Sequence, residues 1–284
     1  MTFTYKWFEF LGKGSFGEVW KGVQVETGAL VAVKLLHANQ RAHFSRFLDE
    51  ARTLQGLAGE PHVVRILDYN FDLDRPMIVL EFCDQGSLRS WVGKRPWRHV
   101  AGALRHAAYG LASVHGIGAL HRDVKPDNLL IASLPVSNEV NIKVADFGVA
   151  RCHQPFTGNM TYSLQGTDGY ISPEVRRGDP FQPPADIFSL GITGIELITG
   201  RKNMASLSSA QIPVEFKNLL NAMCANNPAQ RPSAQQLGSM LSEIEKMEEP
   251  LVEAEKSSSG AGWGLLALGL AVGVGLLALG ASKK

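Results

Sequence analysis

The chain has 284 residues, of which 45% are hydrophobic, so it can bury a sizeable core in one large domain or two small ones. Its net charge of +1 at pH 7 gives no electrostatic basis for binding nucleic acid. Cys83, Cys152 and Cys224 lie far apart without metal-type spacing, so they are interpreted as ordinary thiols of a reducing compartment. Residues 1–14 hold no basic segment followed by an apolar run, so no cleaved signal peptide is expected.

Residues 1–95 are rich in predicted strands. Runs of β-branched and aromatic residues alternate there with glycines, a pattern typical of strands and turns. A helix is predicted at residues 43–57, because apolar side chains recur on one helical face. The predicted strands cover residues 8–14, 17–23, 30–35, 66–69 and 77–82.

A glycine-rich element, GKGSFGEV at residues 12–19, lies between the first two predicted strands. The glycines Gly12, Gly14 and Gly17 would let the backbone approach phosphate oxygens and offer N–H donors to them. A dinucleotide-binding turn requires a helix to begin at the last glycine, but residues 18–23 have strand character. The pattern therefore favours a phosphate-covering loop between two strands.

Lys34 ends the sequence VAVK in the third predicted strand, where a buried charge is costly unless it is paired. Glu50 lies on the following helix, and a Lys34–Glu50 ion pair would hold the ammonium group in place for phosphate. The less favoured alternative for Lys34 is a surface lysine with its stem along the sheet, and Glu50 taken alone would more often be a solvated helix charge.

Residues 96–242 are predicted to be mostly helical. Residues 100–116 form one predicted helix. Residues 185–199 are apolar on nearly all sides, so they should form a buried central helix. A strand is predicted at residues 140–145.

The octapeptide HRDVKPDN at residues 121–128 carries the strongest functional signal. One short loop supplies the Asp123 carboxylate to orient a hydroxyl, Lys125 for the γ-phosphate, and the Asn128 amide oxygen for a metal. Transfer of a phosphoryl group requires these groups within a few ångströms of each other. A single aspartate in such a loop is usually only a turn residue, but the complete set indicates phosphoryl transfer.

Asp146 begins the sequence DFG directly after the strand predicted at residues 140–145. Mg²⁺ prefers carboxylate and phosphate oxygens as ligands. Asp146 is therefore predicted to bind a Mg²⁺ ion that bridges nucleotide phosphates.

The composition changes after residue 242. Residues 243–260 carry six Glu and two Lys and end in serines, which predicts a solvated juxtamembrane linker. Residues 261–281 are 21 residues without a charge, which as a helix would span about 30 Å, the thickness of a bilayer core. This predicts a transmembrane helix followed by the short tail 282–284, the alternative being a buried core helix.

Gly269 and Gly273 form a GxxxG pair in this segment, which would permit a homodimer by close helix approach. The alternative is a glycine-rich anchor with no specific partner. Lys283 and Lys284 would favour an internal C-terminus by the positive-inside preference. Because the phosphoryl-transfer motifs require a cytosolic nucleotide, we expect instead a single-pass membrane protein whose residues 5–242 lie in the cytoplasm.

Taken together, the motifs resemble the eukaryotic-type (Hanks-type) serine/threonine protein kinases, in a compact and bacterial-looking arrangement. GTDGYISPE at residues 166–174 resembles the family sequence GTxxYxAPE, with Ser172 in place of the usual alanine. Asp186 resembles the central-helix aspartate that braces the catalytic loop, and Arg231 the arginine that pairs with Glu174.

The resemblance covers residues 5–242 and implies an α+β, two-lobed protein kinase fold. A β-rich N-lobe would occupy about residues 5–83 and a mainly helical C-lobe about residues 84–242, with one C-terminal transmembrane helix beyond them. The implied cofactors are ATP and Mg²⁺, and the implied partners are protein substrates, including the chain itself by autophosphorylation.

The resemblance also implies a role for each motif residue. Asp123 would be the catalytic base or the residue that orients the hydroxyl, and Lys125 would stabilise the transferred phosphoryl group. Lys34, held by Glu50, would anchor the phosphates. Asn128 and Asp146 would bind the metal. Glu81 and Cys83 would bind adenine through their backbones. The full set expected around the nucleotide is Leu11, Gly12, Gly14, Gly17, Val19, Ala32, Lys34, Glu81, Cys83 and Leu130.

One segment departs from the family pattern. After Gly200 the family usually has a Pro-Phe element and a longer helical insertion, but residues 201–210 are short and lack it. The substrate-docking side of the C-lobe is therefore expected to be trimmed.

Two other functions compete with an active kinase. A catalytically inactive kinase fold serving as a membrane scaffold usually lacks one of the residues equivalent to Lys34, Asp123 or Asp146, yet all three are present here. A small-molecule phosphotransferase of the aminoglycoside type would lack the long segment 149–174.

Overall fold

The computed structural model describes residues 4–13, 17–36, 44–71, 75–133, 140–147 and 169–247, all within one structural unit, Met1–Pro250. Gly14, most of the predicted linker and the predicted membrane segment 261–281 lie outside the described residues. Within the described ranges, no helix is both long enough and apolar enough to cross a membrane.

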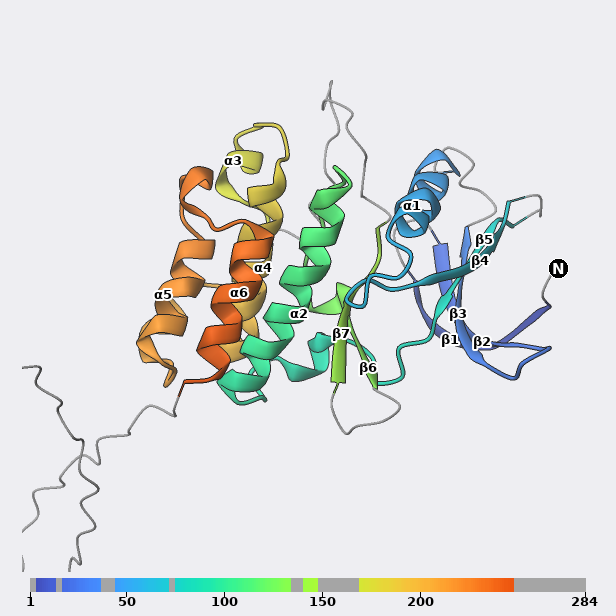
Figure 1. Ribbon diagram of the computed structural model, residues 1–284, viewed down its shortest axis with the longest axis horizontal. Coiled ribbons are helices and arrows are strands. Elements are labelled where there is room, and N and C mark those ends of the chain that lie inside the picture. The colour runs from blue at the N-terminus through green and yellow to red at the C-terminus, as the bar shows by residue number, and fades with distance from the viewer. Residues whose placement is uncertain are drawn as a thin grey trace, which may run out of the picture. The chain divides into compact units, whose positions relative to one another are not determined.

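The N-terminal part is a five-stranded antiparallel sheet in the order β1-β2-β3-β5-β4, with helix α1 (Phe44–Gly56) beside it (Figure 1). All five strands and the helix predicted for this region are confirmed. The strands are β1 (Tyr5–Lys13), β2 (Gly17–Gln24), β3 (Leu30–Leu36), β4 (Ile66–Asn70) and β5 (Met77–Glu81).

The two faces of β3 have different roles because successive side chains of a strand point to opposite faces. Val31, Val33 and Leu35 are at most 3% exposed and pack with residues of β5 in a separate cluster on one face. Ala32 and Lys34 point to the other face, where Leu36, Ile78 and Leu80 join the main core. Lys34 is thereby directed toward the interior of the molecule.

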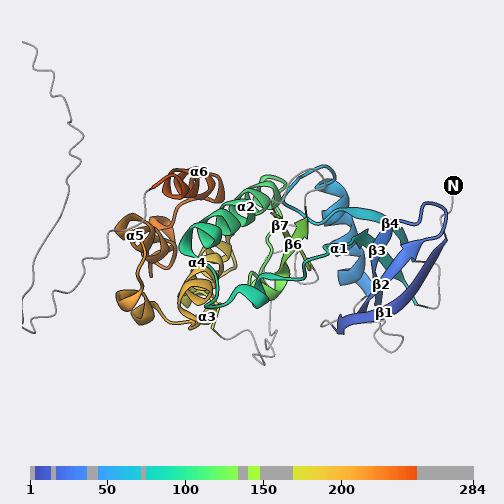
Figure 2. The ribbon, with the colours of Figure 1, turned by 90° about the horizontal axis from the view of Figure 1, so that it is seen from below.

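Four long helices form most of the C-terminal part (Figure 2). Helix α4 is buried along most of its length, which confirms the predicted central helix. At Gly194 an added Cβ would lie 2.7 Å from side-chain atoms of Leu104 and Leu220, so glycine allows α2 and α5 to approach α4 closely. The four are α2 (Trp97–Gly116), α4 (Pro183–Thr199), α5 (Val214–Met223) and α6 (Ala234–Glu245).

A small hairpin of β6 (Leu129–Ser133) and β7 (Val140–Val144) lies between the sheet and the helices (Figures 1 and 2). The Val144 N–H donates to the His62 carbonyl at 2.9 Å, which ties β7 to the loop after α1. The segment after β5 also bonds to this hairpin, because the Gln85 N–H donates to the Ile131 carbonyl at 3.1 Å. The hairpin is therefore attached to both parts.

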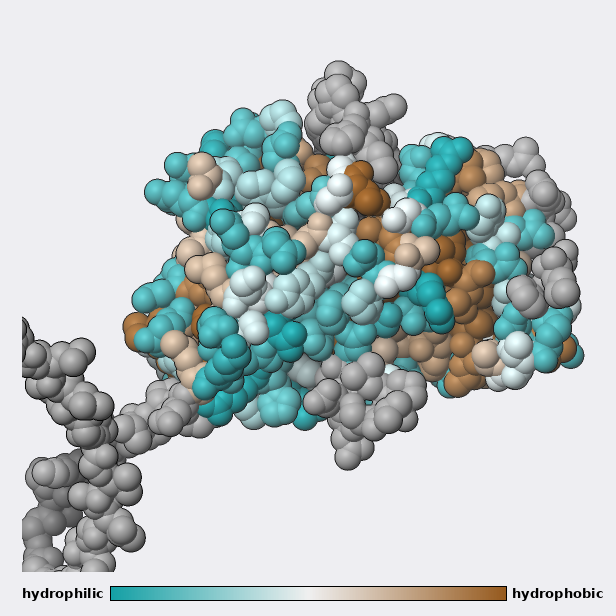
Figure 3. All heavy atoms as spheres, in the orientation of Figure 1, coloured by the Kyte–Doolittle hydropathy of each residue, from teal (hydrophilic) through white to brown (hydrophobic). Residues whose placement is uncertain are grey.

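The exposed apolar side chains concentrate on the five-stranded sheet. Among the described residues, most exposed large hydrophobic side chains belong to or flank the five-stranded sheet, including Trp7, Phe8 and Phe10 of β1. Figure 3 shows hydrophobic surface on the side of the sheet and a mainly hydrophilic surface over the long helices.

Short helices complete the C-terminal part. They are η2 (Leu88–Trp91), η3 (Pro126–Asn128), α3 (Pro173–Arg176), η4 (Met204–Ser209) and η5 (Pro228–Gln230).

Candidate active site

Lys34 of β3 meets two carboxylates from distant parts of the chain. Its Nζ lies 2.7 Å from both carboxylate oxygens of Glu50 on α1 and 2.8 Å from Asp146 Oδ1 after β7. Lys34 is 4% exposed and Glu50 1% exposed, so the expected ion pair is formed and buried. The alternative of a surface lysine does not hold.

The charges of this cluster depend on one another. Burial alone would lower the pKa of Lys34, but the charges of Asp146 and Glu50 raise it above its usual value. The Lys34 ammonium in turn lowers the pKa of Asp146 to about 2. Burial raises the pKa of Glu50, and Lys34 opposes that rise. At neutral pH the cluster therefore presents an ionised Asp146 beside a firmly protonated lysine.

The loop before β6 brings Asp123, Lys125 and Asn128 into direct contact. Lys125 Nζ lies 2.7 Å from Asp123 Oδ2. Asn128 Nδ2 donates to the Asp123 backbone carbonyl at 2.8 Å and to its Oδ2 at 2.9 Å. Both bonds are donated by the side-chain nitrogen of Asn128. Its side-chain oxygen makes neither of them, and it is the atom of this side chain that could coordinate a metal ion.

Asp186 at the start of α4 braces the loop of residues 121–128 through hydrogen bonds. Its carboxylate accepts from the His121 N–H at 3.0 Å and from the Arg122 N–H at 2.8 Å, and it bonds His115 Nε2 at 2.9 Å. Arg122 has φ 68°, a left-handed conformation that is costly for a side chain with a Cβ. The fully buried Asp186 carboxylate stabilises that strained turn, as the sequence predicted for this residue.

Asp146 is positioned against the same loop. The Ala145 N–H donates to the Asn128 carbonyl at 2.9 Å, and the Ala145 carbonyl lies 2.9 Å from His121 Nε2. Asp146 itself has φ 64°, and Phe147 beside it is fully buried with its ring edge-to-face to His121. The two candidate metal ligands, Asn128 and Asp146, are thus fixed relative to each other through the backbone.

Asn128 and Asp146 could bind a hard cation such as Mg²⁺ only together with further oxygen ligands. Among the described residues, no group of three or more His, Cys, Asp or Glu side chains could hold a metal ion. Asn128 and Asp146 offer one amide oxygen and one carboxylate, and Mg²⁺ is commonly bound by one or two such ligands plus substrate phosphates and water. The residues present therefore fit a Mg²⁺ ion that arrives with a nucleotide.

Val19 and Ala32, two of the residues expected to surround adenine, lie on the same face of the sheet as Lys34. Strand register pairs Val19 with Lys34 and Ala32 with Leu80, and paired residues point to the same face. Leu11 and Gly12 lie on β1, with Gly12 opposite Val19, while Gly17 begins β2. Gly14 lies outside the described residues.

The segment after β5 carries the hinge residues. The Glu81 side chain is turned aside, because Lys143 Nζ and the Arg65 N–H hold its Oε1 at 2.7 and 2.8 Å. The Glu81 N–H donates to the Arg65 carbonyl at 2.9 Å, so the backbone of Glu81 can offer a nucleotide only its carbonyl oxygen. Leu130 of β6 bridges to Ser87 at the end of this segment, which places it beside the residues that follow β5.

One cluster beside the site was missed by the sequence reasoning. Arg89 of η2 bonds Asp127 with Nη2 at 2.7 Å, Glu196 of α4 with Nη1 at 2.7 Å, and the Tyr170 hydroxyl at 3.0 Å. Tyr170 in turn donates to Glu196. The hydrogen bond to Asp127 is the main reason that the pKa of Arg89 is raised. Glu196, in a helix predicted to be buried, was a signal that a cationic partner was needed, but it did not identify Arg89.

A second predicted ion pair fixes the segment that follows residue 168. Arg231 Nη1 and Nη2 lie 2.6 and 2.8 Å from the two carboxylate oxygens of Glu174 on α3. Burial would raise the pKa of Glu174, but the hydrogen bonds from Arg231 lower it below its usual value. The kinase resemblance implies activation-loop phosphate acceptors among Thr157, Thr161 and Ser163 and a substrate-platform role for Thr167, and all four lie outside the described residues.

A β-rich lobe and a helical lobe, with a lysine, a catalytic aspartate and two metal-ligand candidates meeting between them, define the protein kinase class. Comparison with known proteins agrees, because residues 5–240 match the model of the protein kinase domain. The chain therefore belongs to the protein kinase family.

Its relatives include bacterial serine/threonine-protein kinases. The chain is 31% identical over 227 residues to the serine/threonine-protein kinase drp72 of Corynebacterium efficiens, an alignment covering 76% of this chain and 42% of the relative. It is 35% identical over 198 residues to Pkn1 of Myxococcus xanthus (67% and 28%). It is 30% identical over 246 residues to PknL of Mycobacterium tuberculosis (78% and 60%).

These comparisons support assignment of the domain to the protein-serine/threonine kinases. The aligned region spans 28–60% of the length of these three relatives.

Proposed function

We propose that this chain is an active serine/threonine protein kinase that transfers the γ-phosphoryl group of ATP to protein hydroxyls, its own included. The observation that carries the proposal is the buried contact of Lys34 with both Glu50 and Asp146. An inactive scaffold would have no need to maintain a buried lysine with two carboxylates, since buried charge is costly to desolvate.

Each residue of the site has a task in this proposal. ATP and Mg²⁺, when bound, supply the phosphoryl group and the positive charge that offsets charge developing on it. Lys34 anchors phosphate oxygens, and Asn128 and Asp146 hold the metal. The Asp123 carboxylate orients the acceptor hydroxyl and takes its proton, and Lys125, whose Nζ lies 2.7 Å from Asp123 Oδ2, offers positive charge to the transferred group.

Incubating the purified chain with labelled ATP and Mg²⁺, followed by phosphoamino-acid analysis, tests this function. We expect phosphoserine and phosphothreonine on the chain, and no incorporation when the divalent cation is removed with a chelator. Labelling confined to tyrosine would contradict the serine/threonine assignment. The absence of any incorporation onto the chain or onto added proteins would favour the inactive scaffold.

We also propose that residues 261–281 anchor the chain in a membrane as a single pass, with residues 5–242 in the cytoplasm. The support is the length and apolar character of the segment, which follows a linker with six Glu and two Lys. The cytosolic location of ATP supports the orientation. The pair Gly269 and Gly273 supports a homodimer through this segment.

Truncation after Ser259 should move the protein from the membrane fraction to the soluble fraction of a cell lysate. A matched variant, Leu270→Arg, keeps the full length but puts a charge at the centre of the segment, which costs about 2.5–3.5 kcal/mol on insertion. It should weaken membrane retention in the same direction. Retention of the truncated form in carbonate-washed membranes would contradict the anchor.

A further inference from the structure

The hairpin of β6 and β7 has two faces, and Lys143 lies on the more exposed one. The side chains of the other face are at most 2% exposed and belong to the main core: Leu129, Ile131, Ile142 and Val144. Successive side chains of a strand point to opposite faces. Leu130 pairs with Lys143 in the register of the hairpin, so these two side chains share a face, and both are half-buried. Lys143 therefore lies beside a residue that is expected to surround adenine.

The Lys143 ammonium connects this hairpin to the five-stranded sheet. Its Nζ lies 2.7 Å from Oε1 of Glu81, at the end of β5, and 3.5 Å from the carbonyl oxygen of Val63. The side chains of Lys143 and Glu81 are 12% and 21% exposed, and salt screens a partly buried pair much less than an exposed one. The ion pair therefore holds the Glu81 carboxylate in one orientation.

The Glu81 carboxylate alters the hydrogen bonding between the end of β5 and Arg65, the residue before β4. Two opposed residues of a hydrogen-bonded antiparallel pair normally exchange both of their backbone N–H···O bonds. The Glu81 N–H donates to the Arg65 carbonyl at 2.9 Å, but the Arg65 N–H donates to Glu81 Oε1 at 2.8 Å. The return bond thus goes to the side chain, and the Glu81 carbonyl oxygen stays outside this exchange, where it can accept from a ligand.

We propose that Lys143 is a positioning residue for recognition of the adenine base, and that it acts through Glu81. The ammonium holds the carboxylate on the Arg65 N–H, which keeps the Glu81 carbonyl for the exocyclic amine of adenine, a hydrogen-bond donor. Without Lys143 the carboxylate turns toward water, since a half-buried charge without a partner is costly. The Arg65 N–H then closes the backbone exchange in competition with the nucleotide. The proposal rests on the kinase activity proposed above, because it concerns the nucleotide of that activity.

Calorimetric titration of the full-length chain in detergent with ADP and Mg²⁺ tests this role without phosphoryl transfer. The comparison ligand is the diphosphate of purine riboside, which differs from ADP only by lacking the exocyclic amine. We expect the wild-type chain to bind ADP about tenfold more tightly than this ligand, because the ligand leaves the carbonyl unpaired. Lys143→Met should reduce the preference to about twofold by raising the Kd of ADP, with the Kd of the comparison ligand unchanged within about twofold.

Three further variants assign the effect to the ion pair. Lys143→Arg keeps a cation beside Glu81 and should retain most of the preference for ADP. Glu81→Ala should reduce the preference as much as Lys143→Met does, and the double variant should reduce it no further, because both changes remove the same interaction. Lys246→Met is the matched control, since Lys246 Nζ also lies 2.7 Å from a glutamate, Glu243, but on the exposed surface of the chain. It should bind both nucleotides as the wild type does.

The outcomes separate this inference from the proposed activity. In transfer from ATP onto the chain itself, Lys143→Met should raise the KM for ATP about fivefold and leave kcat unchanged. An undiminished preference for ADP in Lys143→Met, or an equal rise in the Kd of both nucleotides, would overturn the inference and leave the kinase proposal standing. A wild-type chain that shows the expected preference for ADP but transfers no phosphate would contradict the kinase proposal alone.

Discussion

Replacing Asp123 with asparagine should lower the rate of phosphate transfer by about 10²–10⁴-fold, the usual contribution of a positioned general base. The substitution keeps the shape of the side chain and one oxygen, but the amide cannot take a proton from a hydroxyl. In the wild-type protein Lys125 Nζ and Asn128 Nδ2 both donate to Asp123 Oδ2. The amide nitrogen of the asparagine variant, if placed there, would face these two donors instead of accepting from them. Transfer from labelled ATP onto the chain, under single-turnover conditions, measures the loss.

The affinity for ATP should change little in this variant, because the phosphate-anchoring Lys34 and the metal ligand Asp146 remain. Asp179→Asn provides a matched control, since Asp179 is an exposed aspartate paired only loosely with Arg177 at 3.7 Å. It should transfer phosphate at the wild-type rate. If Asp123→Asn and Asp179→Asn were equally active, Asp123 would not be the base, and the chemistry assigned to its loop would be wrong.

The residues that carry chemistry were predictable because each sits in a short motif with a fixed local geometry. Lys34, Glu50, Asp123, Asn128 and Asp146 are widely spread along the chain, yet each motif specified a strand, a helix or a tight loop. Once the strands and helices were predicted correctly, the buried Lys34–Glu50 contact followed from the kinase resemblance. The limits of β1 and α2 were less precise, because helix and strand ends depend on tertiary contacts.

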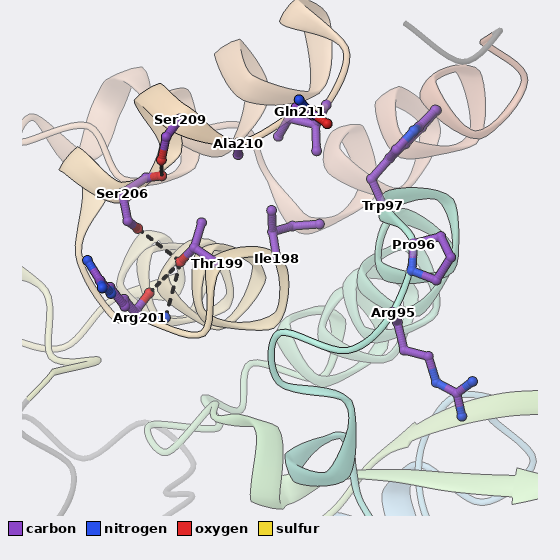
Figure 4. Close-up of a pocket in the computed structure, with 11 residues that line it drawn as sticks. Arg95, Pro96, Trp97, Ile198, Thr199, Arg201, Ser206, Ser209, Ala210 and Gln211 are labelled. Carbon is purple, nitrogen blue, oxygen red and sulfur yellow. Dashed lines mark hydrogen bonds between the residues drawn. The ribbon is translucent and has the colours of Figure 1, made fainter. Parts of the chain in front are cut away.

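The contacts made by residues outside these motifs were not predictable. Arg89 lies in a short 3₁₀ helix, and nothing in the sequence around it points to Glu196, which is 107 residues away. The stacked rings of His62 and His106, 4.4 Å apart, likewise join the loop after α1 to α2 without any local pattern. A cavity lined by the start of α2, the end of α4 and helix η4 likewise arises from elements that meet only in the folded chain (Figure 4). Such features depend on which surfaces pack together, and hydrophobic periodicity carries little information about that choice.

Arg231→Met should destabilise the protein by about 3–5 kcal/mol, which is the usual effect of removing one partner of a buried ion pair. Arg231 is 6% exposed and Glu174 7% exposed, so the remaining Glu174 carboxylate would stay in the interior without its partner. The guanidinium also donates to the Ala225 and Pro184 carbonyls, each at 2.9 Å, and these contacts would be lost as well. Calorimetric unfolding of the full-length chain measures the change.

The double variant Glu174→Gln/Arg231→Met distinguishes a lost ion pair from a general packing defect. Removing the charge of Glu174 removes the cost of burying it alone, so the double variant should be more stable than Arg231→Met by about 1–3 kcal/mol. Arg177→Met, which removes an exposed arginine near the same helix, should change stability by less than about 0.5 kcal/mol. A double variant no more stable than Arg231→Met would mean that the arginine stabilises the lobe through packing and its two carbonyl contacts. In that case α3, and with it the end of the segment that leads from Asp146, would be held by Arg231 itself rather than by the charge it shares with Glu174.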